Sequence, residues 1–206
     1  SVQLKLKTIL EAKNLELAGC YHQEPMSYPA LYAWCEDQAE QFAPYITDTS
    51  LYLETALANG KKILLEAQLG AMRDIDYPYT SSSSTIAAYA PIGAGIPWAH
   101  PDHVIGVLKA YSSCVGVGPF VAEKAMGRTW NDTLREAGHE YGSATGRPQR
   151  VGPFDAVAAR YGLKIQNADK LALTKLDVLS HLEEIPVITA YDRDGQQTTT
   201  FDSFED

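Results

Sequence analysis

Apolar residues recur at helical spacing along the first sixty residues and predict three helices. The first covers roughly the first fifteen residues, and the second is indicated by an apolar face over 31–42. The third follows Asp48, a typical N-capping residue, and ends at Asn59-Gly60, a typical helix stop. The chain therefore opens with a helical region, 1–59.

The pattern changes after Gly60, where short apolar runs alternate with helical segments. Residues 61–66 predict a buried strand, and 102–108 predict a helix capped by Asp102. The remaining elements expected are strands at 110–115, 171–173 and 186–191, helices at 129–137 and 154–166, and a turn at Gly195 leading into 196–201. This alternation predicts an α/β protein, a single domain 1–206 in which helices flank a mostly parallel sheet and 60–206 holds the strands.

Composition limits the classes of partner. The 206 residues carry a formal net charge of −9 and a pI near 5.0, which excludes a broad basic surface for nucleic acid. The longest apolar stretch, 86–99, is interrupted by two prolines and two glycines and predicts no membrane span. Three widely spaced cysteines indicate neither a disulfide framework nor a zinc site, and His100 and His103 lack a third ligand nearby. We expect a cytoplasmic protein without a metal site of its own.

Charged residues directly follow the strand predicted at 171–173. In an open α/β sheet, ligands bind beyond the carboxyl ends of the strands, the position of Lys175, Leu176 and Asp177. The Asp177 carboxylate can accept hydrogen bonds from the N1–H and the exocyclic amine of guanine, while the Lys175 stem covers the base. Adenine lacks this pair of donors, so such a site would select guanine. Alternatively, Asp177 only caps a helix that begins at Val178.

A second candidate site is the glycine-containing loop 142–150, which carries Arg147 and Arg150. Glycine lets a backbone approach a ligand closely, and a guanidinium group binds a carboxylate or phosphate at two points. Pro148 favours an extended Arg147, which projects the side chain outward. The alternatives are a surface loop with solvated arginines, or an Arg147 that pairs with Asp155 and only fixes the loop.

Several of these segments, in this order, carry motifs of one family. They are ILLEAQLG (63–70), DIDYPY (74–79), KAYSS (109–113) with VGVGPF (115–120), EYGSATGRPQRVG (140–152) and LTKLDVL (173–179). The region from about Gly60 to Gly195 resembles the adenylosuccinate synthetases, the GTP-dependent ligases of AMP biosynthesis. The shared order of five motifs argues against a chance match.

The resemblance implies a P-loop-NTPase-like α/β fold and a ligase reaction. In the family, GTP phosphorylates the 6-oxygen of IMP, and the amine of L-aspartate then displaces phosphate to form adenylosuccinate. Mg²⁺ and GTP are implied as cofactors, and a family-like homodimer is expected. The implied site residues are Gln68, Ser81, Val115 and Arg147 for IMP; Ser143, Ala144, Thr145, Gly146, Arg147, Pro148 and Gln149 for the aspartate loop; and Lys175, Leu176 and Asp177 for GTP.

The sequence departs from the family pattern at some of these positions. The IMP-contacting Gln is displaced to Gln68 or replaced by Leu69, and Ser81 stands where the family has Thr. Ala144 replaces a threonine, and Gln149 replaces an arginine that contacts GTP. The family's phosphate loop, catalytic Asp and His, and Mg²⁺ ligands have no counterpart here, so we assign no catalytic residue and expect the isolated chain to be inactive. The alternative function is a non-catalytic guanine-nucleotide-binding relic or regulatory fragment.

Overall fold

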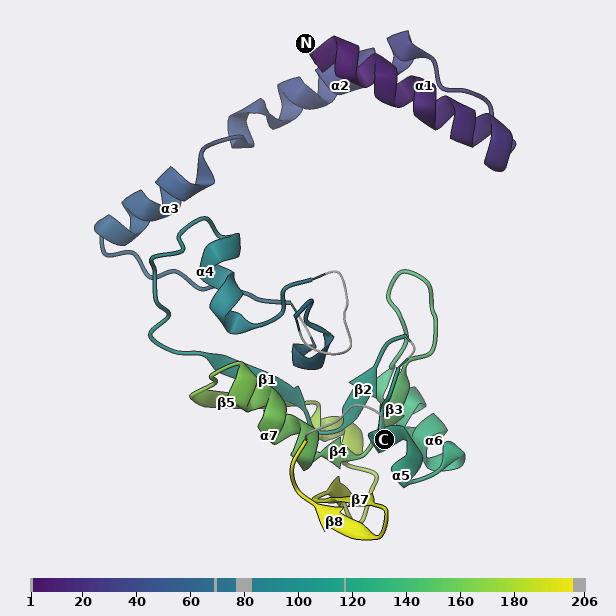
Figure 1. The fold of residues 1–206 in the computed structure, drawn as a ribbon, viewed down its shortest axis with the longest axis vertical. Coiled ribbons are helices and arrows are strands. Elements are labelled where there is room, and N and C mark those ends of the chain that lie inside the picture. Colours follow the sequence, from purple (N-terminus) through teal and green to yellow (C-terminus); the bar gives the residue numbers. More distant parts are fainter. Residues whose placement is uncertain (1, 69, 77–82, 117, 202–206) are drawn as a thin grey trace. The chain divides into compact units, whose positions relative to one another are not determined.

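The computed structural model describes residues 2–68, 70–76, 83–116 and 118–201, and the chain divides into two compact units, Ser1–Tyr52 and Leu53–Asp206. The helices, labelled in Figure 1, are α1 (Val2–Cys20), α2 (Tyr28–Phe42), α3 (Thr49–Ala58), α4 (Ala90–Gly93), α5 (Ala122–Ala125), α6 (Arg128–Gly138) and α7 (Ala156–Ile165). The strands are β1 (Ile105–Lys109), β2 (Ser112–Cys114), β3 (Arg150–Gly152), β4 (Phe154–Asp155), β5 (Lys170–Thr174), β6 (Val187–Ile188), β7 (Tyr191–Arg193) and β8 (Gln196–Thr198). Short 3₁₀ helices lie at Ala43–Tyr45, Ala71–Arg73, Ala87–Tyr89 and Leu176–Leu179.

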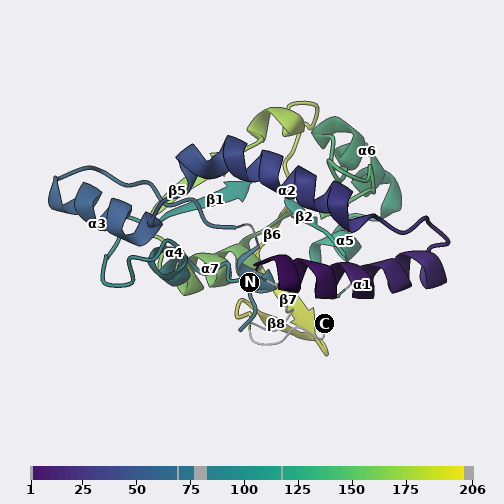
Figure 2. The same ribbon diagram turned by 90° about the horizontal axis from the view of Figure 1, so that it is seen from above.

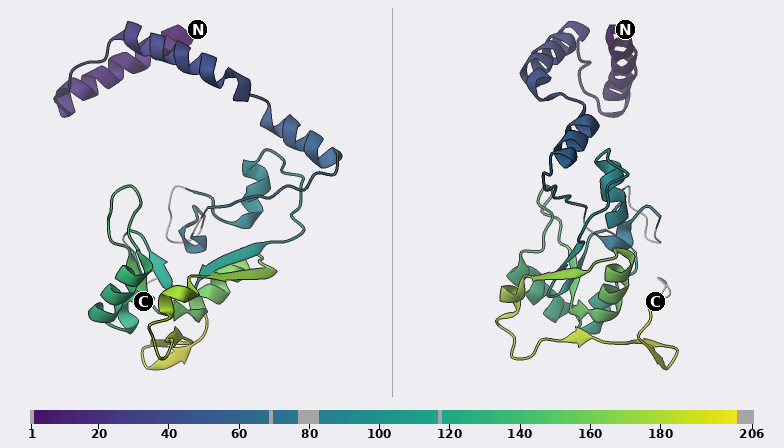
Figure 3. Two further views of the ribbon diagram at one scale, coloured as in Figure 1. Left: turned by 180° about the vertical axis from the view of Figure 1, so that it is seen from behind. Right: turned by 90° about the vertical axis from the view of Figure 1, so that its left-hand side faces the viewer.

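In the first unit, α1 and α2 lie side by side (Figure 2, Figure 3). Gln3 of α1 donates to the Tyr32 hydroxyl of α2 at 3.1 Å, and the Asn14 amide holds the connecting segment, because it donates to the Met26 carbonyl and accepts from the Met26 N–H, both at 2.8 Å. The helices predicted in this region are confirmed, and Asp48 accepts the Leu51 N–H at 3.0 Å at the start of α3. None of the helices in the described ranges combines the length and the apolar character that a bilayer span requires.

The second unit contains a parallel pair of strands, β1 and β5, with α7 beside them (Figure 1). All five residues of β1 lie opposite the five residues of β5. Gly106 allows close packing here, because a Cβ at this position would meet the Leu163 side chain of α7 at 2.5 Å. The strand predicted at 171–173 is therefore confirmed as part of β5.

The helix predicted at 102–108 is wrong, because this segment contains most of β1. Ile105 and Val107 are β-branched and Gly106 is a weak helix former, so local propensity already disfavours a helix. Pairing with β5 then overrides the capping signal of Asp102.

The other described strands also pair two by two: β2 with β3, β4 with β6, and β7 with β8. The β4–β6 pair is parallel, and the other two pairs are antiparallel. The segment predicted as one strand at 186–191 contains β6 and the first residue of β7, and the turn at Gly195 forms the β7–β8 hairpin. Parallel strand pairs together with helices confirm the α/β class.

The main apolar core lies between α6, β3 and the chain that links β1 to β2. Its buried members are Ala110, Tyr111, Leu134, Val151 and Leu179. α6 contributes Leu134, which is 1% exposed, and β3 contributes the fully buried Val151. This core supports the loop that precedes β3 and the 3₁₀ helix that follows β5.

The buried strand predicted at 61–66 is also wrong. This segment forms no strand, and Leu64 is 91% exposed. Within the described ranges no strand pairs with it, and an apolar run becomes a strand only where a partner satisfies its backbone groups.

Gly152 offers a test of the packing between β3 and α5. A Cβ at Gly152 would overlap the backbone carbonyl of Ala122, which has no rotamer through which to move away. We expect Gly152→Ala to lower the free energy of unfolding by about 1–3 kcal/mol, measured by chemical denaturation. Gly93→Ala is the matched control, since a Cβ at Gly93 would meet nothing within 4 Å. Equal stability of the two variants would contradict this packing.

Candidate functional site

The loop 140–150 is a narrow hairpin whose tip is fixed by backbone hydrogen bonds. The Gly142 N–H donates to the Arg147 carbonyl, and the Gly146 N–H donates to the Gly142 carbonyl, both at 2.8 Å. Gly146 has a φ of +64°, a left-handed conformation that glycine adopts without strain. Residues 143–148 are all exposed. The segment expected to bind aspartate is thus a shaped loop whose tip faces solvent.

Arg147 lies at this tip with an exposed side chain. Among the residues that the structure describes, Arg147 takes part in no ion pair. Asp155, the partner considered above, is occupied elsewhere: it accepts the Val157 and Ala158 N–H groups of α7. Its second oxygen accepts the Tyr191 hydroxyl at 2.7 Å. The pairing of Arg147 with Asp155 is therefore wrong.

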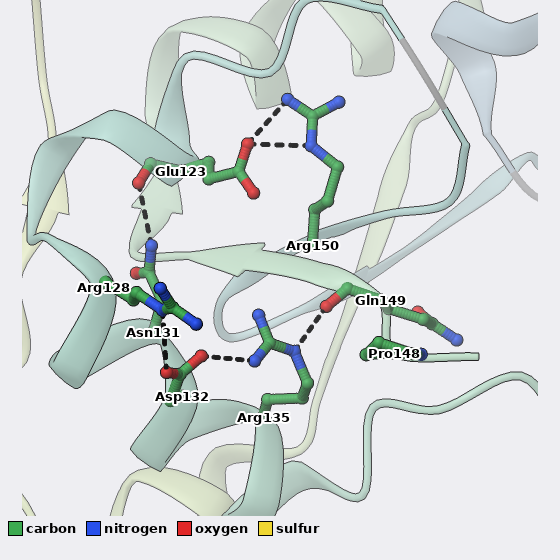
Figure 4. A pocket seen from close by; sticks show the side chains of 8 residues that line it. All are labelled: Glu123, Arg128, Asn131, Asp132, Arg135, Pro148, Gln149 and Arg150. Atoms are coloured by element: carbon green, nitrogen blue, oxygen red, sulfur yellow. Dashed lines mark hydrogen bonds and ion pairs between the residues drawn. The ribbon is translucent and has the colours of Figure 1, made fainter. Parts of the chain in front are cut away.

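Arg150, the other arginine of the segment, is held in place (Figure 4). Its Nε and Nη2 lie 2.8 and 2.7 Å from the same carboxylate oxygen of Glu123, and its Nη1 donates to the Gly118 carbonyl at 2.6 Å. Its guanidinium carbon also lies 5.3 Å from the centre of the Phe120 ring. Arg150 thereby holds Gly118 and Phe120, which lie shortly after Val115, a residue that is 53% exposed.

An open depression of about 430 Å³ lies beside α6 (Figure 4). Its lining residues are Glu123, Arg128, Asn131, Asp132, Arg135, Pro148, Gln149 and Arg150. Its charged groups are largely paired with one another: Arg135 Nη1 lies 2.5 Å from Asp132 Oδ1, and Arg135 Nε donates to the Gln149 carbonyl at 2.7 Å. These contacts make the depression a structural charge network that fixes the base of the loop.

The candidate guanine-binding residues follow β5. Lys175 adopts a left-handed conformation with a φ of 58°, and the 3₁₀ helix Leu176–Leu179 begins directly after it. Lys175 occupies the N-cap position of that helix, and no side chain caps the helix. Asp177 lies inside the helix with an exposed side chain, so its carboxylate does not serve as the cap considered above. Leu176 is 53% exposed on the same segment.

A buried carboxylate connects these two regions. Glu140 is 2% exposed, and the Lys109 ammonium lies 2.8 Å from both of its carboxylate oxygens. The Tyr111 hydroxyl donates to Oε1 at 2.5 Å, and the Lys175 ammonium donates to the same oxygen at 3.2 Å. Burial by itself raises the pKa of Glu140, but the hydrogen bonds from these three side chains outweigh it and hold that pKa below its usual range. Burial and the bond to Glu140 raise the pKa of Tyr111.

The sequence did not single out Glu140. The available signal was its position at the start of the motif 140–152, since an acidic residue with a glycine two positions away on either side otherwise indicates a surface turn. Two of its partners are distant in the sequence: Lys109 lies 31 residues away and Lys175 lies 35 residues away. No local sequence pattern predicts such contacts.

Of the other candidate residues for IMP, only some can be placed. Gln68 is exposed and has no hydrogen bond to another candidate residue within the described ranges, and Ser81 lies outside the described residues. Asp74, which the sequence also did not single out, is fully buried and accepts the backbone N–H groups of Asp76, Thr85 and Ile86. Burial raises the pKa of Asp74, and these bonds outweigh burial and lower it. Asp74 therefore fixes both flanks of the segment that contains Ser81.

Comparisons with known proteins identify relatives of this chain. The family described as adenylosuccinate synthetase matches residues 1–206. The adenylosuccinate synthetase of Lactococcus lactis subsp. lactis (strain IL1403) is 41% identical over 201 residues, which is 96% of this chain and 46% of that protein. The same enzyme of Caldanaerobacter subterraneus subsp. tengcongensis is 43% identical over 195 residues, 93% of this chain and 45% of that protein.

A solved structure is similar as well. Fully ligated adenylosuccinate synthetase from Plasmodium falciparum aligns with a TM-score of 0.75 and 32% sequence identity, over 94% of this chain and 47% of that chain. The chain thus spans a little under half the length of the curated relatives that it matches, 46% in the first case.

The role of Arg150 can be tested by stability. We expect Arg150→Lys to lower the free energy of unfolding by about 1–2 kcal/mol, because an ammonium group cannot replace both guanidinium contacts to the Glu123 oxygen while also donating to the Gly118 carbonyl. Arg128→Lys is the control: its side chain is 95% exposed and its Nε lies 3.7 Å from Asp132. A change within about 0.5 kcal/mol is expected there. If denaturation shows the same loss for both variants, Arg150 does not have the structural role described.

Proposed function

The chain belongs to the adenylosuccinate synthetase family, and on that premise we propose that it forms the guanine-, IMP- and aspartate-binding region of a GTP-dependent ligase. The reaction proposed for the complete protein is the joining of L-aspartate to IMP to give adenylosuccinate in AMP biosynthesis. The observation that carries the proposal is a contrast between neighbours. Arg147 and Asp177 are exposed, whereas Arg150 and Lys175, close to them in the chain, are held by hydrogen bonds and ion pairs.

In this proposal, the loop 143–149 binds aspartate. The Arg147 guanidinium can bind the aspartate carboxylate at two points and also reach an oxygen of IMP. Thr145 supports this role, because its hydroxyl accepts the Arg147 N–H at 3.4 Å and so bends the backbone beneath the arginine. Val115 offers apolar contact to IMP, and Gln68 and Ser81 are included as further IMP-binding positions by resemblance to the family.

The guanine base is proposed to lie against Lys175, Leu176 and Asp177. The ammonium of Lys175 is bound to the Gly138 carbonyl at 2.8 Å and to Glu140, which leaves the methylene stem as its ligand-facing part. The exposed Asp177 carboxylate is then available for the N1–H and the exocyclic amine of guanine. Adenine presents no such pair of donors, so the site distinguishes the two bases.

Mg²⁺ is implied by the family, and it is usually held by one or two carboxylates together with substrate phosphates. Within the described ranges no group of three or more His, Cys, Asp or Glu side chains is placed to hold a metal ion, and the residues assigned here to ligands include one carboxylate, Asp177, which is proposed to bind guanine. We therefore assign no step through Mg²⁺ and no catalytic residue to this chain. Its residues bind and orient the substrates, and the expectation that it makes no adenylosuccinate alone stays a prediction. A family-like homodimer and a cytoplasmic location belong to the same proposal.

Selection of guanine can be measured on the chain itself. We expect guanosine, GDP and GTP to bind more tightly than the corresponding adenine compounds, and Asp177→Asn to remove most of this preference. The loss expected is about 1.5–3 kcal/mol, the contribution of hydrogen bonds to a charged group. Calorimetric titration provides the measurement. Glu184→Gln, which removes another exposed acid close by in the chain, is the control and should bind like the unmodified protein. Equal affinity for both bases would refute the assignment of Asp177.

The aspartate loop can be tested in a protein completed with the remaining part of a family member. There, Arg147→Leu should raise KM for aspartate and for IMP together by about tenfold or more, because a charge-assisted contact to each is lost. Circular dichroism and thermal melting should be unchanged, since the side chain is exposed. Arg160→Leu replaces another exposed arginine, on α7, and should leave turnover unchanged. Unaltered KM values in Arg147→Leu would show that the loop does not bind these substrates.

A further inference from the structure

Glu140 takes part in both of the regions that the proposed function treats as separate binding sites. Through its backbone it forms the base of the aspartate loop, because its carbonyl accepts the Gln149 N–H at 2.9 Å. Through its side chain it binds the Lys175 ammonium, at the start of the guanine-binding segment. Lys175 also donates to the carbonyl of Gly138, the last residue of α6 and two residues before Glu140.

We propose that Glu140 is a positioning residue that couples the guanine-binding segment 175–177 to the aspartate loop 143–149. This inference rests on the proposed function for the identity of the two ligands. The coupling itself rests on one residue, Glu140. Its backbone forms the base of the aspartate loop, and its buried carboxylate binds Lys175, the first residue of the guanine-binding segment.

The geometry leaves Glu140 little freedom to move alone. The Lys109 ammonium bonds both carboxylate oxygens and also the Ser113 hydroxyl, at 2.8 Å in each case. The Tyr111 hydroxyl, itself 2% exposed as a residue, donates to the same carboxylate. Lys109 and Tyr111 therefore fix the carboxylate, and a displacement of Lys175 must either break its bond to Glu140 or move the base of the loop.

The loop transmits such a movement because its two arms are bonded to each other. Tyr141 and Pro148 form an isolated antiparallel bridge directly beyond the Glu140–Gln149 bond, and the Gly142 N–H donates to the Arg147 carbonyl further on. A shift of Glu140 at the base of the loop therefore also moves Arg147, the residue proposed to bind aspartate. Placement of guanine against Lys175 would, by the same contacts, favour one arrangement of the loop.

Hydrogen exchange of the 206-residue chain tests the coupling without a ligand. Glu140→Gln keeps the shape of the side chain but removes its charge, and should raise exchange rates about tenfold or more in both 142–149 and 174–179. Lys175→Met, which keeps the stem and leaves Glu140 paired with Lys109, should also raise exchange in 142–149. If Glu140→Gln does not fold, Lys175→Met decides alone. A rise in only one of the two segments in Glu140→Gln, or a rise confined to 174–179 in Lys175→Met, would overturn the proposal.

Asp169→Asn is the matched control, because Asp169 precedes β5 whereas Lys175 follows it. Asp169 bonds His103 at 2.6 Å and the Val104 N–H at 2.7 Å, so its variant should raise exchange near those residues and leave 142–149 unchanged. A rise in 142–149 in this variant too would mean that any loss of charge loosens the loop, which would overturn a specific role of Glu140.

Saturating GDP separates positioning from a purely structural role. In the unmodified chain GDP should slow exchange in 142–149 as well as in 174–179, and in Lys175→Met it should slow exchange in 174–179 alone. Protection confined to 174–179 in the unmodified chain, or protection of both segments in Lys175→Met, would overturn the coupling. A chain that binds GDP no better than ADP would instead refute the proposed function, and the exchange rates of the ligand-free variants would still decide the coupling.

Discussion

Burial of a carboxylate requires compensation of its charge, and at Glu140 this requirement gathers distant parts of the chain. The side chain is 2% exposed, and two ammonium groups and a phenol surround it. Lys109 is the last residue of β1, and Lys175 directly follows β5. Because β1 and β5 are parallel and in register, both lysines emerge at the same end of the pair. The strand pairing and the charge cluster therefore specify the same arrangement, and loss of the carboxylate would leave two ammonium groups uncompensated.

In the aspartate loop and in the segment after β5, a charged side chain that is fixed by an ion pair lies close in sequence to one that is exposed. Arg147 is exposed and Arg150 is bound to Glu123, while Asp177 is exposed and Lys175 is bound to Glu140. Such a division suits a binding site, since a side chain that must meet a ligand is best placed on a backbone that other contacts have already fixed. It also explains why composition alone could not identify the site residues: residues of the same type have structural roles at some positions and are available to ligands at others.

The helices α1, α2, α3, α6 and α7, the strand β5 and the β7–β8 hairpin could be predicted because their signals are local, whereas the short helices α4 and α5 were not predicted. Apolar spacing, the cap at Asp48 and the turn at Gly195 act within a few residues. The segments 61–66 and 102–108 were assigned wrongly because their state depends on partners: β1 is a strand because β5 lies beside it, and 61–66 has no partner among the described residues. For the site, the position after β5 and the glycine–arginine pattern made Asp177 and the loop candidates, and the family motifs added their ligands. Glu140, Asp74 and the fixed state of Arg150 depend instead on contacts between segments far apart in sequence.

Lys175 shows how the charge cluster and the backbone support each other. Its φ of 58° lies in the left-handed region, which disfavours residues other than glycine by roughly 1–2 kcal/mol, so the conformation needs compensation from its surroundings. Its ammonium provides this through the Gly138 carbonyl and the Glu140 carboxylate. His139, between those two residues, is left-handed as well and ends α6, which turns Glu140 out of the helical path. Both strained residues thus flank one carboxylate, and the contacts to it stabilise the backbone that presents Asp177.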